Sequence, residues 1–137
     1  MENNRDHQLL HLRPEIASIN FQAAMTGEEA FQNAIIRPIL KLQNDLLLAV
    51  FIQYLQDHQV KFSSMNRDER EAYIANAIQK DNQLRGQMQG IVIGHFTLDE
   101  WQLFVQHKKP LTKRLLQMLV QRLQNQTGEI ARKFDID

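Results

Sequence analysis

Apolar residues recur at helical spacing along most of this chain. The longest pattern covers residues 36–54, where one broad apolar face is formed by Ile36, Ile39, Leu40, Leu46, Leu47, Val50, Phe51 and Tyr54. The opposite side begins with a polar stripe formed by Arg37, Lys41, Asn44 and Asp45. Beyond this stripe both sides are apolar, which predicts a helix that runs from the surface into the centre of a helical domain.

Capping residues divide the remaining pattern into helices. A residue with a polar side chain is followed three positions later by Glu at Thr26, Asn66 and Thr97. Each of these pairs is typical of a helix start, because the two side chains satisfy backbone N–H groups that the first turn leaves unpaired. The helix that begins near Gly27 should continue to about His58. Pro38 lacks an N–H group and crowds the carbonyl four residues earlier, which predicts a kink or break near Ile36.

The predicted fold is therefore all-α. We expect a single-domain bundle of four to six helices with a Pro-kinked central helix, formed by residues 26–127. The apolar residues of segment 1–25 follow no clear period. We therefore expect this segment to be an N-terminal arm that is weakly ordered or packed on the body. Residues 128–137 begin with Gly128 and are mostly polar, and we expect them to form a frayed C-terminal tail.

Composition limits the class of protein. The 137 residues are enough for one buried core, and the absence of cysteine excludes disulfides and thiolate chemistry. The longest apolar run, residues 46–52, is far below the roughly 20 residues that span a bilayer. The polar start does not fit a secretory signal. A cytoplasmic protein with no membrane partner is the expectation.

The formal net charge is zero, but the charge is unevenly distributed. Residues 1–101 carry 9 Lys and Arg against 13 Asp and Glu, whereas residues 102–137 carry 7 against 3. An acidic and a basic surface can face each other within one molecule or between two. Together with the apolar surface left over on the last helix and the arm, this favours self-association, as a homodimer or higher oligomer, or binding to another protein.

Residues 97–124 also have the outline of a helix-turn-helix, with Lys113 and Arg114 near the start of the second helix. That helix is rich in leucine and methionine, which leaves little surface for the edges of bases. A core or interface helix fits this composition better. Nucleic acid therefore stays a minor alternative as a partner.

Catalytic and cofactor motifs are absent from the sequence. It contains no phosphate loop, dinucleotide-binding loop or nucleophile elbow, so we assign no catalytic residue and no cofactor. Two groups have the composition of a metal site: His7 with His11, and His95 with Asp99, Glu100 and His107. The first group lacks a third ligand, and the carboxylates of the second are better explained by a helix start. No metal site is predicted.

The polar stripe has no capping role to explain it. One interpretation is a solvated surface, and a second is a polar network covered by another element. A third interpretation is a small anion pocket built on Arg37 and Lys41, with Asn44 and Asp45 beside it. His95 and Trp101 are a further pair that can line a small pocket. These six residues are the candidate ligand-binding residues.

Three segments resemble a family of short uncharacterised bacterial proteins, across roughly residues 30–124. They are Arg37-Pro38-Ile39-Leu40-Lys41-Leu42-Gln43-Asn44-Asp45-Leu46, Val92-Ile93-Gly94-His95-Phe96-Thr97-Leu98-Asp99-Glu100-Trp101 and Lys113-Arg114-Leu115-Leu116-Gln117-Met118. Some members carry the name glyoxalase, which implies a small carbonyl substrate. Enzymes of the glyoxalase I type are paired βαβββ modules with metal ligands on strands, whereas the periods of this chain are helical.

The sequence thus favours a binding or self-association module without an evident catalytic apparatus. The alternative is a protein or enzyme that binds a small anionic or carbonyl compound through the polar stripe. The second alternative is a helix-turn-helix-like nucleic-acid binder.

Overall fold

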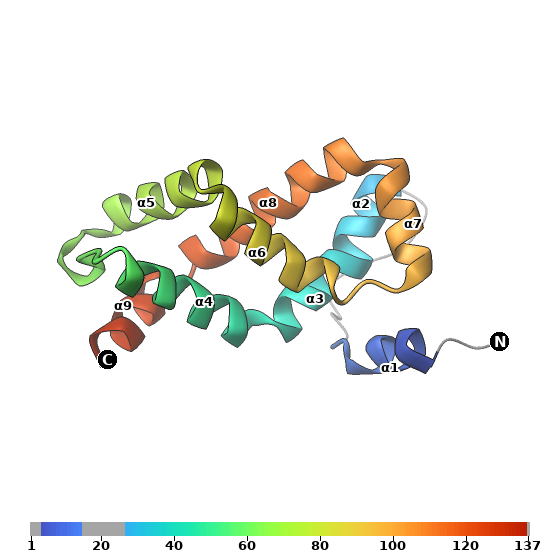
Figure 1. The fold of residues 1–137 in the computed structure, drawn as a ribbon, viewed down its shortest axis with the longest axis horizontal. Coiled ribbons are helices and arrows are strands. Elements are labelled where there is room, and N and C mark those ends of the chain that lie inside the picture. The colour runs from blue at the N-terminus through green and yellow to red at the C-terminus, as the bar shows by residue number, and fades with distance from the viewer. Residues whose placement is uncertain (1–3, 15–26, 137) are drawn as a thin grey trace.

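Every regular element is helical in this computed structural model, which describes residues 4–14 and 27–136. The elements are α1 (Asn4–Leu12), α2 (Gly27–Phe31), the π-helix η1 (Gln32–Ile36), α3 (Arg37–Leu42), α4 (Asn44–Asp57), the 3-10 helix η2 (Phe62–Ser64), α5 (Arg67–Lys80), α6 (Asn82–Ile93), α7 (Leu98–Gln106), α8 (Lys108–Gln124) and α9 (Thr127–Ile136) (Figure 1). The all-α prediction is confirmed. The predicted number of helices, four to six, is too low for the described residues.

The predicted kinked helix from 27 to 58 is divided more finely than the sequence indicates. The break near Ile36 takes the form of a π-helical turn, η1, in which the N–H of Arg37 bonds to the carbonyl of Gln32. The wider turn moves the carbonyls away from the ring of Pro38. A second break follows at Gln43, whose φ of −94° and ψ of 8° separate α3 from α4. The pattern of apolar residues does not predict this second break.

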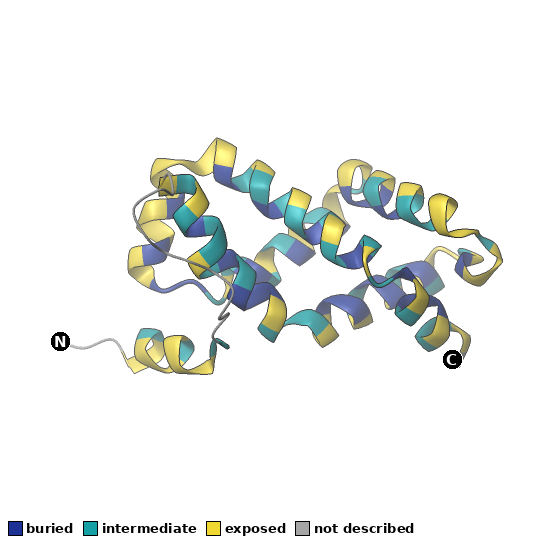
Figure 2. Ribbon diagram, turned by 180° about the vertical axis from the view of Figure 1, so that it is seen from behind, coloured by how far each residue is buried: buried dark blue, intermediate teal, exposed yellow. Residues whose placement is uncertain are grey.

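The core lies between α4 and the helices that pack on it. Contacts join α4 to α6 and α9, and α8 to α5, α6, α7 and η1. In Figure 2 the buried faces of these helices turn toward one another. The fully buried side chains of α4 are Leu47, Leu48, Phe51 and Leu55. The first half of the predicted helix is buried too, since Ile36 and Ile39 are 0% exposed, so both halves contribute to the core.

Local capping signals place α5, α6 and α7 correctly. Asn66 and Thr97 each form the predicted capping box, with Glu69 and Glu100 respectively. Asp81 caps α6 by accepting from the backbone N–H groups of Gln83 and Leu84. Thr26 lies outside the described residues.

The C-terminal residues do not form the predicted frayed tail. They form α9, in which Ile130 is 0% exposed and Ala131 is 7% exposed. This helix contacts α4, α5 and η2, and the hydroxyl of Ser63 donates to the carboxylate of Asp135. These two buried apolar side chains attach α9 to the core. The polar composition of the segment does not predict this helix.

The first part of the predicted arm, residues 4–14, contacts the body through polar groups. No residue of α1 itself is buried. The side chain of Arg5 donates to the carbonyl of Gly94, and the carboxylate of Asp6 accepts from the N–H of Leu98. Arg13 reaches the same loop, where its guanidinium binds Glu100 at 2.5 Å through both oxygens. Residues 15–25 of the predicted arm lie outside the described part.

Candidate functional site

Two arginines meet in a cavity between the first half of the chain and α8. The cavity has a volume of about 390 Å³. We call it the basic pocket, and its lining consists of Gln32, Arg37, Leu40, Met118, Gln121, Arg122, Asn125 and Gln126. The residues come from η1, α3, α8 and the α8–α9 turn. This volume falls in the range of small-molecule sites, roughly 300–1,000 Å³.

The basic pocket carries two positive charges. Arg37 and Arg122 are both part-buried, and the Nε atom of Arg37 is buried without a hydrogen-bond partner. Burial lowers the pKa of the Arg122 guanidinium, and the nearby charge of Arg37 lowers it further. Arginine side chains carry their charge throughout the physiological pH range, so the two guanidinium groups bring two positive charges to the pocket. None of the described residues that line the pocket is acidic.

A network of amides holds Arg122 in place. The side chains of Asn44 and Gln126 bond to each other in both directions, at 3.0 and 2.8 Å. The Oδ1 atom of Asn44 also accepts from Nη1 of Arg122 at 3.2 Å, and Gln126 donates to the backbone carbonyl of Arg122. Asn44, at the start of α4, is thus the fixed acceptor that orients an arginine of α8.

The neighbouring arginine, Arg114, is arranged differently. Its guanidinium lies 3.7 Å from the carboxylate of Glu28 and donates to Oε1 of Gln32 at 3.0 Å. Its charge is therefore balanced by an acid. Because Arg114 uses the oxygen of the Gln32 amide, the amino group of Gln32 is the part of this side chain that a ligand in the basic pocket can use.

The charged groups of the basic pocket are all hydrogen-bond donors. The amide oxygens of Asn44, Gln126 and Gln32 are already engaged by protein donors. The two guanidinium groups can only donate, and arginine forks match the oxygen pairs of carboxylates and phosphates. A part-buried site with two cations and no acid therefore suits an anion.

The structure brings together only part of the predicted site. Arg37 lines the basic pocket, and Asn44 belongs to the amide network that holds Arg122. Lys41 and Asp45, from the same polar stripe, are exposed and do not line it. The break at Gln43 turns α4 relative to α3, so the four residues do not form one continuous stripe.

His95 and Trp101 lie at the α6–α7 connection and not at the basic pocket. The carbonyl of His95 accepts from Arg13 at 2.6 Å, and its Nδ1 atom is buried without a hydrogen-bond partner. Burial lowers the pKa of the His95 imidazole, and the charges of Arg13 and Arg5 lower it further. Trp101 is 41% exposed and stacks on Phe104 with ring centres 5.9 Å apart.

The two groups of histidines and carboxylates considered as metal sites have other roles in the structure. His7 and His11 face each other on α1, with Nε2 atoms 3.2 Å apart. Glu100 is engaged by both Arg13 and the capping box. Within residues 4–14 and 27–136, no group of three or more His, Cys, Asp or Glu side chains is placed to hold a metal ion. None of the helices in these ranges is long and apolar enough to cross a membrane.

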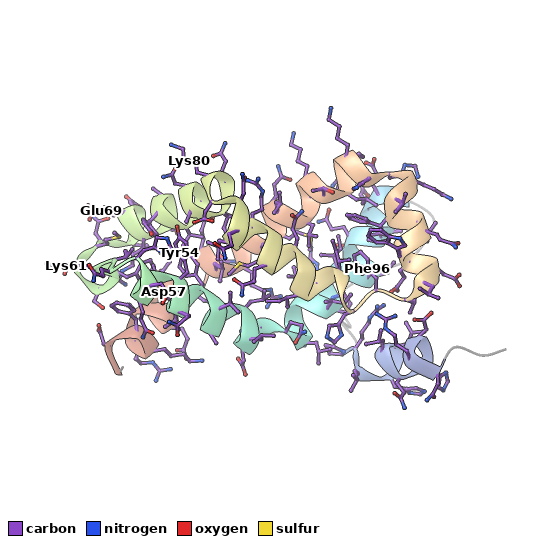
Figure 3. All side chains as sticks on the ribbon, in the orientation of Figure 1. Tyr54, Asp57, Lys61, Glu69, Lys80 and Phe96 are labelled. Carbon is purple, nitrogen blue, oxygen red and sulfur yellow. The ribbon has the colours of Figure 1, made fainter. Side chains whose placement is uncertain are left out.

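A second cavity, of about 410 Å³, lies between α4 and α6. Tyr54 and Asp57, both on α4, line it together with His58 and Asp81. Figure 3 labels Tyr54 and Asp57. Burial raises the pKa of Tyr54 to about 12, with smaller contributions from Tyr73 and Asp81. The phenol is therefore protonated at neutral pH and acts as a hydrogen-bond donor, not as a base. Tyr73 of α5 and Asp81, the cap of α6, are thus the neighbours that act on the Tyr54 phenol.

Comparison of the chain with models of protein families, with curated proteins and with solved structures gives no match. The resemblance to bacterial proteins labelled glyoxalase thus stays a prediction from three sequence segments.

Sequence reasoning does not assign Arg122 to the site. Its partner Asn44 is 78 positions away in the chain, so no local motif joins them. One signal is present. Arg122 follows Leu115 and Leu119 at helical spacing, which puts a charge at the edge of the buried face of α8. A charged residue at such an edge needs a partner within the fold.

Proposed function

We propose that this protein binds a small anionic ligand in the basic pocket, through Arg37 and Arg122. The observation that carries the proposal is a part-buried pair of guanidinium groups in a cavity whose described lining contains no acid. Keeping two like charges close together disfavours the empty state, and an anion removes that repulsion. The amide network around Asn44 orients one of the arginines before any ligand arrives, which reduces the entropy lost on binding.

The test is titration calorimetry of the full chain with inorganic phosphate, sulfate, citrate and acetate, at low ionic strength in a cationic buffer. Arg37→Gln and Arg122→Gln should each raise Kd by about tenfold or more, because each removes a charge-assisted hydrogen bond. Lys41→Gln is the matched control. It removes one charge from the exposed side of the same helix and should leave Kd unchanged.

A second variant addresses the charge directly. Asn44→Asp places a carboxylate where Arg122 already bonds, so an internal ion pair competes with the ligand. Anion binding should be lost while the melting temperature stays the same or rises. Unchanged anion affinity in Asn44→Asp, or in both arginine variants, argues against the basic pocket as the site.

Self-association is a second candidate function. The helix α7 exposes three apolar side chains at helical spacing, with exposed fractions of 56% for Leu98, 41% for Trp101 and 47% for Val105. A repeat of i, i+3 and i+7 puts them on one face. Exposed apolar faces of this kind support contacts between proteins.

Sedimentation velocity over a wide concentration range tests this candidate. The wild-type chain should show a concentration-dependent rise in mean mass. Trp101→Lys should reduce it, whereas Gln102→Lys, at an exposed polar position of the same helix, should reduce it less. A strict monomer at high concentration removes this candidate without affecting the basic pocket.

A further inference from the structure

We infer that the basic pocket takes a doubly charged head group, and that its ligand is a phosphate monoester with a small polar body. The inference rests on the proposed anion binding and makes it more specific. The first observation is the charge of the residues that line the pocket. Arg37 and Arg122 bring two positive charges to one cavity, and the described lining brings no negative one. A monoanion leaves one part-buried charge uncompensated, whereas a dianion compensates both.

Arg114 gives a local comparison, because a protein carboxylate balances its charge. It lies beside the basic pocket, and the carboxylate of Glu28 stands 3.7 Å from its guanidinium. Within the described residues, neither Arg37 nor Arg122 forms an ion pair with a carboxylate. Among the described residues, the two arginines that line the cavity thus have no carboxylate partner; Arg70 and Arg85 have none either, but their guanidinium groups donate to backbone carbonyls and do not line this cavity. That difference matches a ligand charge of two.

The positions of the two arginines favour a ligand with a tetrahedral head group over one with a planar head group. Arg37 begins α3, and Arg122 belongs to the last two turns of α8, so their guanidinium groups belong to different walls of the cavity. A carboxylate presents two oxygens in one plane, which one arginine fork satisfies. A phosphate monoester presents three acceptor oxygens in different directions. It can accept from Arg37, Arg122 and the amino group of Gln32 together.

The remaining lining defines the body of the ligand. Gln121 and Asn125 lie one helical turn apart and present amides, while Leu40 and Met118 present apolar surface. Amide side chains both donate and accept, which suits hydroxyl groups. The described lining includes no aromatic ring on which a base could stack. A short hydroxylated chain or a sugar fits this wall better than a nucleotide.

The experiment compares acetate, sulfate and glycerol 3-phosphate by titration calorimetry at pH 7.5 and pH 5. Sulfate should bind about tenfold or more tightly than acetate at both pH values. Glycerol 3-phosphate should bind more tightly than sulfate at pH 7.5, by about three- to tenfold for a neutral hydrogen bond from its hydroxyls. At pH 5 its affinity should fall by about tenfold, because the second pKa of a phosphate monoester is near 6 and the dianion becomes the minor form. Sulfate, which does not titrate in this range, reports any change in the protein itself.

Each result has a separate meaning. Acetate binding as tightly as sulfate, with no effect of pH on glycerol 3-phosphate, overturns the dianion inference and leaves anion binding intact. Equal affinity for glycerol 3-phosphate and sulfate at pH 7.5 overturns the inference that the ligand has a polar body bound by the pocket. No binding of any of the three probes overturns the proposed function as well. Binding of glycerol 3-phosphate that survives in the double variant Arg37→Gln with Arg122→Gln places the site elsewhere and overturns both.

Discussion

At the scale of single residues, the ion pair between Arg13 and Glu100 is the most buried in the described part of the chain. The exposed fractions of the two side chains are 7% and 11%. Glu100 also accepts from the backbone N–H of Thr97, so one carboxylate caps α7 and holds α1. A charge buried at this level is costly to leave without its partner.

Replacing Arg13 should therefore lower the free energy of unfolding more than replacing the exposed Arg5. Arg13→Ala should lower the free energy of unfolding by about 2 kcal/mol, as expected for lost hydrogen bonds between charged groups. Water can reach Glu100 once α1 moves away, which limits the loss. Arg5→Ala should cost roughly 0–1 kcal/mol, because Arg5 is 49% exposed. Urea unfolding measures both, and equal losses would contradict the role given to the buried pair.

His95 makes stability depend on pH. Its pKa is lowered in the fold, first by burial and then by the charges of Arg13 and Arg5, whereas in the unfolded chain it is about 6.5. Between the two values the unfolded chain binds more protons, so the free energy of unfolding should fall as the pH drops below about 6.5. Urea unfolding at pH 7.5, 6.5 and 5.5 should show this fall. It should be smaller in His95→Gln, and an equal fall in that variant would exclude His95 as its source.

At the scale of elements, α9 completes the core from the end of the chain. Ile130 is fully buried where α9 meets α4, α5 and η2. Because α9 is short, one such residue carries much of its attachment. The α9 helix also follows Gln126, which belongs to the network around Arg122. The packing of α9 and the position of this amide are therefore connected.

Ile130→Ala should lower the free energy of unfolding by about 3 kcal/mol, the usual cost of an apolar truncation in a packed core. Arg132→Ala, on the exposed side of the same helix, should leave the urea midpoint unchanged. An equally small effect of both variants would show that α9 is detached in solution. A weaker affinity for sulfate in Ile130→Ala would further show that α9 supports the basic pocket.

At the scale of the whole molecule, the sequence predicts features that depend on near neighbours. Asn66 and Thr97 signal their helices because each cap needs a partner only three residues away. The all-α class follows from the period of the apolar residues. The break near Ile36 follows from Pro38, which is also a local signal, whereas no local pattern indicates the second break at Gln43.

The candidate site shows the same limit. Arg37 and Asn44 attract attention because they are polar residues beside an apolar face; Arg37 lines the pocket and Asn44 belongs to the amide network. Lys41 and Asp45 look equivalent in sequence, yet the structure leaves them exposed. Arg122 completes the site from 78 positions beyond Asn44. Only the folded chain distinguishes the residues that meet from those that do not.

The placement of Trp101 decides what an optical experiment on this protein can report. It is the single tryptophan of the chain, and it lies on α7 next to Glu100, which binds Arg13. The basic pocket has no aromatic residue in its described lining. Tryptophan emission is therefore a probe of the α1–α7 contact. It should change in Arg13→Ala and stay constant when sulfate binds, whereas circular dichroism follows all helices. Unfolding curves from the two signals, compared in one urea series, would reveal whether the arm leaves before the bundle unfolds.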